Sequence, residues 1–204
     1  MDGNHREDSL VAADRRRQAD PAIEPLLAEI ERLQAELMQA KWTIAELEAR
    51  ADIDPLLDIL NRRGFDRELS RAVAYVGRYG TQAALVFIDL DGFKAVNDRH
   101  GHAAGDELLK TVARLLTGRV RASDVVARFG GDEFAVLLWN LDEAQANAKA
   151  RELEEAIAAV LVSEGRFGAS AGVVPLTGKE TPAAIVDAAD KAMYVRKRER
   201  RGPE

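Results

Sequence analysis

Acidic side chains stand where two stretches of the sequence predict strands. The continuous apolar run 83–90 has the length of a buried strand and carries Asp89 near its end. Asp132 and Glu133 follow a pair of glycines and lead into a second apolar run. A buried carboxylate without a partner is destabilising by several kcal/mol, so these acids require a counter-charge or a metal ion. If the two strands are neighbours, Asp89 and Asp132 converge, and their hard oxygens suit Mg²⁺ beside a phosphate ester.

The turn that carries Asp132 is predicted to close a β-hairpin. The apolar runs 125–129 and 133–139 flank Gly130-Gly131-Asp132, and glycine supplies the positive φ that tight hairpin turns require. Taken alone, Asp89 also fits a helix N-cap or a surface turn. Together with the hairpin acids, a metal site is the better interpretation.

The composition limits the chemistry further. The 204 residues include no cysteine, so disulfides and thiolate ligands are excluded, and a metal must be held by oxygen or by the three histidines. His100 and His102 share a short turn bordered by glycine with no third histidine nearby, which makes a poor zinc site. The formal net charge of −6 argues against broad, non-specific binding of nucleic acid.

The sequence also contains no segment suited to a membrane. No stretch reaches the roughly 18 uninterrupted apolar residues of a membrane span, and residues 1–10 lack the apolar core of a signal peptide. We therefore expect no membrane span and a cytoplasmic location.

Three segments are expected along the chain. Residues 1–20 are polar without apolar periodicity, which predicts a disordered leader. Residues 21–53 are predicted to form a coiled-coil stalk, and Asp54-Pro55 interrupts it and begins a globular domain, residues 54–204. The heptad a positions hold Ile23, Ile30 and Ile44, and the d positions hold Leu26, Leu33 and Leu47.

Isoleucine at a with leucine at d favours a parallel two-stranded coil, so the stalk is predicted to dimerise the chain. The alternative is a single amphipathic helix packed on its own domain.

The globular segment mixes helical and strand patterns. Its fold class is predicted to be α/β of the α+β type, with a mixed, mostly antiparallel central sheet flanked by helices. The expected helices are residues 61–79, 105–116, 143–162 and 182–200, and the expected strands are residues 83–90, 125–129, 133–139 and 167–174.

The segment Arg128 to Phe134 resembles the signature loop of GGDEF-domain diguanylate cyclases and is complete at every signature position. The resemblance extends over residues 54 to about 201, because several further blocks occur in the family's order and spacing. These blocks are Asn61-Arg62-Arg63, Asp89 to Lys94, Asn97-Asp98, Gly101-His102, Gly105-Asp106 and Ala189-Asp190 through Tyr194.

This resemblance implies a sheet like that of nucleotide cyclases and the polymerase palm, with two metal ions on the phosphates of GTP. Asp89 and Asp132 would be side-chain ligands and the Leu90 carbonyl a backbone ligand. Glu133 would help to hold the second metal or assist deprotonation of the attacking 3′-hydroxyl. The implied cofactor is Mg²⁺, with Mn²⁺ as a substitute.

Residues for substrate binding follow from the same resemblance. Asn97 and Asp106 would read guanine, since a carboxylate accepts from N1–H and N2–H while an amide donates. Backbone amides at a helix start would surround the terminal phosphates, and the turn glycines would let the backbone approach the nucleotide. Near the last helix end, basic side chains would contact phosphate, although such residues also suit any helix carboxyl end. The positions concerned are Gly92, Phe93, Lys94, Gly130, Gly131, Lys197 and Arg201.

A second site is implied by Arg121-Ala122-Ser123-Asp124, which has the RxxD form and is separated from Gly130 by five residues. In the family this position marks an inhibitory product site, for which Arg151 is a weaker candidate as a second contact. One departure concerns the linker, where Leu56-Leu57-Asp58-Ile59 replaces the usual Leu-Thr-Gly-Leu.

The expected function is the condensation of two GTP into cyclic di-GMP and pyrophosphate by a coiled-coil-tethered homodimer, with product inhibition through the RxxD site. A non-catalytic cyclic di-GMP receptor is one alternative. The intact Gly-Gly-Asp-Glu-Phe loop argues against it, because such receptors usually have an altered signature loop. A structural coiled-coil adaptor is another. The sequence does not identify the input signal.

Overall fold

A computed structural model describes residues 23–50, 52–160 and 167–201, and it describes the side chains of these residues except those of 44–50 and Arg201. The chain divides into two compact units, residues 1–48 and 49–204. The expected leader, residues 1–20, lies outside the described residues. None of the described helices combines the length and apolar character needed to cross a membrane.

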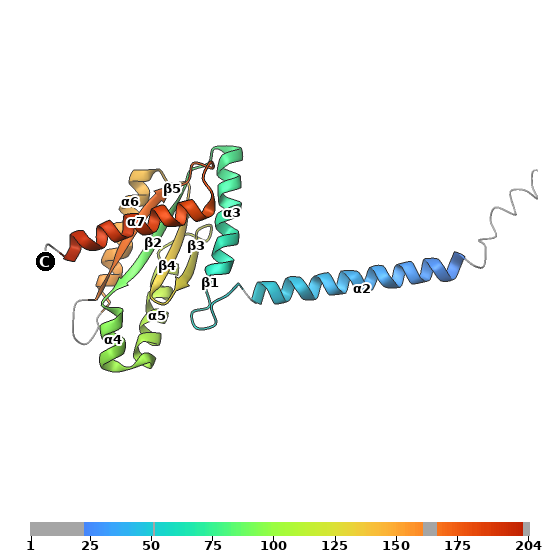
Figure 1. Cartoon of the computed structure of the whole chain (residues 1–204), viewed down its shortest axis with the longest axis horizontal. Helices are drawn as coiled ribbons and strands as arrows, with labels where there is room; N and C mark the ends of the chain where they lie inside the picture. Colours follow the sequence, from blue (N-terminus) through green and yellow to red (C-terminus); the bar gives the residue numbers. More distant parts are fainter. Residues whose placement is uncertain (1–22, 51, 161–166, 202–204) are drawn as a thin grey trace, which may run out of the picture. The chain divides into compact units, whose positions relative to one another are not determined.

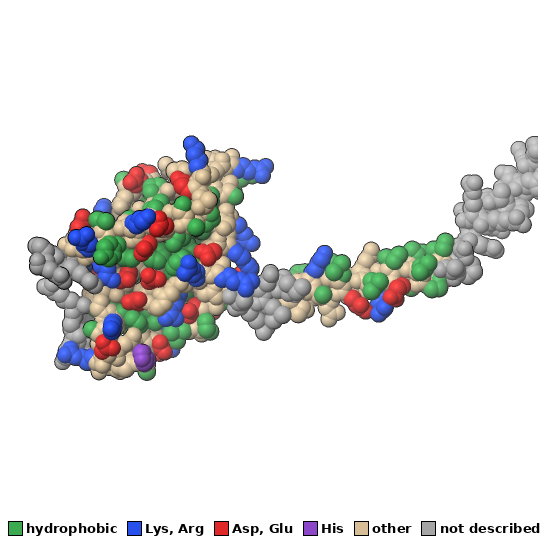
Figure 2. Space-filling model, viewed as in Figure 1, with side chains coloured by type: hydrophobic (Ala, Val, Ile, Leu, Met, Phe, Trp, Pro, Cys, Tyr) green, Lys and Arg blue, Asp and Glu red, His purple; other side chains and the backbone are tan. Residues whose placement is uncertain are grey.

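The predicted stalk forms one helix, α2 (Ile23–Arg50). Its apolar stripe is open to solvent in the single chain, and hydrophobic side chains lie at the surface along the helix (Figure 2). Arg32 forms exposed ion pairs with Glu29 at 2.6 Å and Glu36 at 2.9 Å, which stabilise the helix only weakly because water screens them. The described members of the stripe are Ile23, Leu26, Ile30, Leu33 and Leu37.

Five strands form one sheet in the order β1-β3-β4-β2-β5. All neighbours are antiparallel except β1 and β3, which confirms the predicted mixed, mostly antiparallel sheet. The strands are β1 (Leu60–Asn61), β2 (Ala83–Asp91), β3 (Val125–Gly130), β4 (Glu133–Trp139) and β5 (Gly168–Pro175).

Helices cover both faces of this sheet (Figure 1). One face carries α3 and α7, and the other carries α4, α5 and α6. The helices are α3 (Arg62–Tyr79), α4 (Phe93–His100), α5 (His102–Thr117), α6 (Glu143–Ala158) and α7 (Pro182–Arg201). The helix expected over residues 143–162 ends at Ala158, and residues 161–162 lie outside the described residues.

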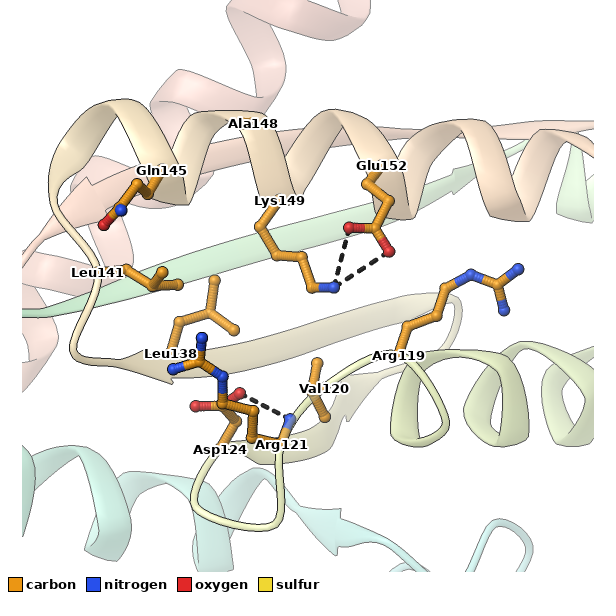
Figure 3. A pocket seen from close by; sticks show the side chains of 10 residues that line it. All are labelled: Arg119, Val120, Arg121, Asp124, Leu138, Leu141, Gln145, Ala148, Lys149 and Glu152. Carbon is orange, nitrogen blue, oxygen red and sulfur yellow. Dashed lines mark hydrogen bonds and ion pairs between the residues drawn. The ribbon is translucent and has the colours of Figure 1, made fainter.

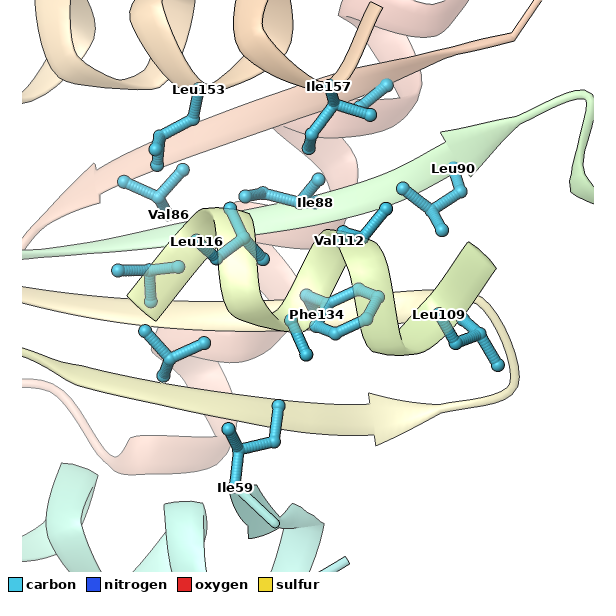
Figure 4. Close-up of a cluster of buried hydrophobic side chains, with 14 of the residues drawn as sticks. Ile59, Val86, Ile88, Leu90, Leu109, Val112, Leu116, Phe134, Leu153 and Ile157 are labelled. Atoms are coloured by element: carbon cyan, nitrogen blue, oxygen red, sulfur yellow. The ribbon is translucent and has the colours of Figure 1, made fainter. Parts of the chain in front are cut away.

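The strand period of two decides which side chains meet which helices. Along β2, Val86, Ile88 and Leu90 join the core beneath α5 and α6 (Figure 4), whereas Leu85 and Phe87 join the core beneath α3 and α7. The same alternation puts Asp89 on the α3 and α7 face, at the end of the strand.

The linker keeps a compact turn despite its unusual residues. Asp58 adopts φ 54°, a left-handed conformation in which aspartate is tolerated better than most side chains. Leu57 and Ile59 are buried, and the Asp54 carboxylate accepts hydrogen bonds from the amides of Leu56 and Leu57 at 2.9 and 3.0 Å.

Candidate active site

The register of β2 and β4 brings the acids from two distant segments together. Asp89 lies opposite Glu133 in the antiparallel pair. At the next step, the Leu90 amide donates a hydrogen bond to the carbonyl of Asp132, 3.2 Å from N to O. Asp89, Asp132 and Glu133 therefore meet at one end of the sheet, as the apolar runs and the hairpin predicted.

The hairpin turn is held from the side by an arginine. Gly131 adopts φ 46°, and its carbonyl accepts from Nε and Nη2 of Arg128 at 3.0 and 2.8 Å. Nη1 of Arg128 contacts the Asp54 carboxylate at 3.2 Å, which links the turn to the linker. A Cβ added at Gly131 would meet nothing within 4 Å, so space is open beside this turn.

The clustered charges perturb the acids. Burial raises the pKa of Glu133, the charges of Asp89, Asp132 and Asp190 raise it further, and Arg62 opposes them. Burial also raises the pKa of Asp89, which Lys197 lowers and the charges of Asp132 and Asp91 raise. Burial is the largest cause of both raised pKa values, and the charges of the neighbouring acids add to it.

Lys197 reaches this cluster from α7. Its ammonium donates a hydrogen bond to Asp89 and lies 3.6 Å from Oδ1 of Asp91. The other oxygen of Asp91 accepts from the Ser170 hydroxyl at 2.7 Å, while Oδ1 has no hydrogen-bond partner although it is buried. The predicted phosphate-binding lysine thus faces the acids.

No group of three or more histidine or acidic side chains in the described part of the chain is arranged as a ready metal site. The donors nevertheless fit a hard divalent cation. They are hard carboxylate oxygens that lie close enough to raise one another's pKa, and one buried oxygen of Asp91 lacks a hydrogen bond.

The residues predicted to read guanine lie at the junction of α4 and α5. The Oδ1 atom of Asn97 is buried and has no hydrogen-bond partner. Gly105, the neighbour of Asp106, packs so closely against Asn97 that a Cβ there would lie 2.0 Å from Oδ1. Asp106 itself is exposed.

The predicted phosphate cradle coincides with the start of α4. Gly92 is the N-cap and adopts φ 86°, which glycine accepts without strain. Phe93 begins the helix, and Lys94 is exposed. The side chain of Arg201, the other predicted phosphate contact, lies outside the described residues.

Two charged residues near the acids were not assigned from the sequence. Arg62 stacks on the Phe129 ring at 4.5 Å from the ring centroid and opposes the raised pKa of Glu133. Asp190 acts on Glu133 from α7. Both residues lie in motif blocks noted in the sequence, and these blocks could have indicated that they lie near the site.

The RxxD segment borders a separate cavity of about 330 Å³ between the loop after α5 and α6 (Figure 3). Asp124 shapes this loop, because its carboxylate accepts from the amides of Arg121 and Trp139 at 2.9 and 3.0 Å. Arg121 and Lys149 both line the cavity. Arg151 is exposed on α6 and does not line it.

A mixed sheet with converging acids at a glycine turn defines a nucleotide-cyclase-like domain, and sequence comparison places it in a family. Residues 51–203 match the family described as "Diguanylate cyclase, GGDEF domain". The chain belongs to this family.

Individual relatives agree. Diguanylate cyclase TpbB of Pseudomonas aeruginosa is 40% identical over 186 residues, which cover 87% of this chain and 41% of TpbB. The probable diguanylate cyclase DgcE of Escherichia coli is 38% identical over 172 residues, 82% of this chain and 16% of DgcE. The chain thus spans less than half the length of these relatives.

A solved structure is similar over most of the chain. The coiled coil and GGDEF domain of DgcB from Caulobacter crescentus, in complex with c-di-GMP, matches with a TM-score of 0.72 and 26% identity. The match covers 85% of this chain and 95% of the DgcB chain.

Proposed function

We propose that this chain is a diguanylate cyclase that condenses two molecules of GTP into cyclic di-GMP and two molecules of pyrophosphate. The observation that carries the proposal is the register that sets Asp89 opposite Glu133 while the Leu90 amide binds the Asp132 carbonyl. Three acids beside an open glycine turn suit phosphoryl transfer, in which charge must be neutralised around phosphorus.

In the proposed reaction, the 3′-oxygen of one GTP attacks the α-phosphorus of the other. The bond from that phosphorus to the pyrophosphate oxygen breaks, and the hydroxyl proton leaves to a base. A second attack in the opposite direction closes the ring. Most of the rate enhancement comes from holding the two nucleotides in line.

The proposed binding groups are those that the motif positions indicate. Asn97 and Asp106 bind the guanine edge, the amide as donor and the carboxylate as acceptor. The amides of Gly92, Phe93 and Lys94 and the ammonium of Lys197 bind the phosphates. Arg201 is proposed as a further phosphate contact.

Divalent metal, Mg²⁺ or Mn²⁺, would be held by the carboxylates of Asp89, Asp132 and Glu133 and the carbonyl of Leu90. When bound, it supplies positive charge beside the phosphates and the attacking hydroxyl. Glu133 is proposed to help hold the second metal ion or to assist deprotonation of the attacking 3′-hydroxyl.

The reaction requires two domains that face each other, since each holds one GTP. We propose that residues 21–53 pair as a parallel coiled coil and that residues 54–204 form the catalytic domain. The exposed stripe of α2 supports this pairing, and tethering raises the effective concentration of one domain near the other.

Product inhibition is proposed at the cavity beside α6. Arg119 and Arg121 place guanidinium groups on its walls, which suits the phosphates of a cyclic dinucleotide, and Lys149 pairs there with Glu152 at 2.9 Å. Arg151 is exposed on α6, and we propose that it is a second contact, made from a neighbouring domain. The DgcB relative was solved in complex with c-di-GMP.

The primary test is incubation of the full chain with GTP and Mg²⁺, followed by chromatographic separation of nucleotides. We expect cyclic di-GMP from the wild type and none from Asp132→Ala. Binding of cyclic di-GMP that depends on Arg121, without any product from GTP, would instead establish a receptor. Absence of both activities would overturn the proposal.

Pairing is tested separately with point variants of the full chain. Leu33→Glu introduces a charge at a d position and should lower the mass in solution from dimer to monomer. Its activity per chain should then fall steeply on dilution, whereas Gln39→Glu, at an outer position, should behave as the wild type. An unchanged mass for Leu33→Glu would contradict the coiled coil.

A further inference from the structure

The last turns of α7 lack an apolar anchor. Ile185, Ala189 and Met193 are buried against the sheet, and Met193 is the last buried residue in the described part of the helix. Up to that point packing is tight, because a Cβ added at Gly172 of β5 would lie 2.3 Å from the Met193 amide nitrogen. Beyond Met193, polar contacts must hold the helix in place.

Those contacts converge on one buried carboxylate. Glu154 of α6 has a side chain that is 7% exposed, and Arg196 of α7 donates to it at 3.2 Å. Arg200, one turn further, lies 3.8 Å from the same carboxylate. The amide of Ala171 in β5 also donates to it at 2.9 Å.

This arrangement closes the edge of the sheet. β5 is the last strand in the sheet order, so one of its sides has no strand beside it. On this strand Glu154 accepts from the Ala171 amide, and Arg200 donates to the carbonyl of Ala169. Side chains of α6 and α7 thereby satisfy backbone groups that an uncovered edge would leave free.

Two adjacent residues of α7 therefore have different partners. Arg196 is directed to Glu154, while Lys197, about 100° further around the helix, is directed to Asp89. Glu154 and Ser170 are the two buried polar residues among those whose burial is described. Ser170 fixes Asp91 beside the Lys197 ammonium, and Glu154 holds Arg196, the residue that precedes Lys197.

We infer that Glu154 is a positioning residue for the nucleotide: it holds the last turns of α7 so that Lys197 faces the site of the terminal phosphates. The inference rests on the proposed function, in which Lys197 binds those phosphates. Glu154 touches neither the acids nor the proposed nucleotide groups, and it acts through Arg196 and Lys197.

A double-mutant cycle on nucleotide affinity tests this role. The probe is GTP with a methylene bridge between the α- and β-phosphates, which cannot release pyrophosphate, and GMP serves as the matched ligand without terminal phosphates. Glu154→Gln keeps an acceptor for the Ala171 amide but removes the charge that holds Arg196. We expect this variant to lower the affinity for the triphosphate about threefold to tenfold and to leave the affinity for GMP unchanged.

Lys197→Ala should lower the affinity for the triphosphate about tenfold or more, because it removes a charged hydrogen-bond donor. In the Lys197→Ala background, Glu154→Gln should then have a smaller effect, carried by Arg201 at the end of the same helix. Glu155→Gln, an exposed neighbour on α6, is the control and should bind both ligands as the wild type does. Arg196→Gln should reproduce the effect of Glu154→Gln, and it provides the test if the glutamate variant fails to fold.

The outcomes are distinct. Equal weakening of triphosphate and GMP by Glu154→Gln, or full additivity with Lys197→Ala, would show a merely structural role and overturn the inference. A wild type that binds neither ligand, or an unchanged affinity in Lys197→Ala, would instead refute the proposed function on which the inference rests.

Discussion

The ammonium of Lys197 is ion-paired with the carboxylate of Asp89, the residue that lies opposite Glu133 in the sheet. The two side chains are 18% and 15% exposed, so the pair is largely shielded from water. Lys197 therefore supplies the counter-charge that the carboxylate of Asp89, next to an apolar strand, was expected to require. A metal ion at Asp89 has to compete with this ammonium.

Removal of Lys197 should strengthen metal binding in the absence of nucleotide. With Lys197→Met we expect the dissociation constant for Mn²⁺ to fall about fivefold, as loss of about 1 kcal/mol of competing charge implies. Electron paramagnetic resonance of free Mn²⁺ measures this directly. Lys191→Met is the control, because that ammonium pairs with Asp187 at 2.6 Å on the exposed side of α7. An unchanged or weaker affinity for Mn²⁺ would show that Lys197 does not compete.

Neutralising Glu133 should stabilise the protein at neutral pH. Burial, then the neighbouring acids, raise its pKa, so the folded chain binds this proton more tightly than the unfolded chain. The resulting destabilisation is absent below the pKa of the unfolded chain, grows as the pH rises to the folded pKa, and persists above it.

For Glu133→Gln we therefore expect a Tm higher by about 2 °C at pH 7 in the absence of metal, because the partly exposed site screens the effect. The gain should vanish as the pH approaches about 4, where both states are protonated. Thermal unfolding at several pH values checks this, with Glu155→Gln as the exposed control. A lower Tm at pH 7 for Glu133→Gln would contradict the electrostatic interpretation.

A methyl group at Gly105 should disturb guanine binding. In Gly105→Ala the new Cβ would lie 2.0 Å from Oδ1 of Asn97 and 3.2 Å from Cζ of Phe93, so the amide must move. We expect GTP affinity to fall at least about tenfold and stability by about 1–3 kcal/mol through overpacking. Calorimetry with GTP and with tripolyphosphate separates the two effects.

Tripolyphosphate lacks guanine, so its affinity should survive the Gly105→Ala change. Gly118→Ala is a matched control, since Gly118 follows α5 with an ordinary φ of −73°. Equal loss of both ligands would place the damage in the fold and not in the guanine site.

Much of this fold followed from apolar periodicity. The run 83–90 and the hairpin 125–139 were recognisable because buried strands leave uninterrupted apolar residues between glycine turns. The two-residue strand β1 was not, since a pair such as Leu60-Asn61 has no periodicity. The end of α6 was placed too late because its apolar pattern continues past Ala158.

The site also contains residues that the sequence predicts and residues that it does not. Acids at strand ends could be predicted because charge next to an apolar run is conspicuous. Glu154 could not be, since on the helix it reads as one of several surface acids, and only the folded chain shows that the edge of β5 and two arginines surround it. Pairing across the sheet edge depends on tertiary distance and leaves no local pattern.

We expect Arg128 to couple the linker to the hairpin turn at Gly131, and variants of Arg128 and Asp54 can measure this coupling. Its guanidinium donates twice to the Gly131 carbonyl and once to Asp54, whose other oxygen caps the linker amides. Arg128→Gln removes both sets of contacts, and we expect it to reduce stability by about 1–2 kcal/mol and to slow cyclic di-GMP formation. Asp54→Asn keeps the acceptor for the linker amides and loses only the charge, so its effects should be smaller. Denaturant titrations and initial rates of the two single variants and the double variant measure the coupling. If the ion pair transmits the effect, the double variant matches Arg128→Gln alone, whereas simple addition of the two losses would show that the linker and the turn are independent.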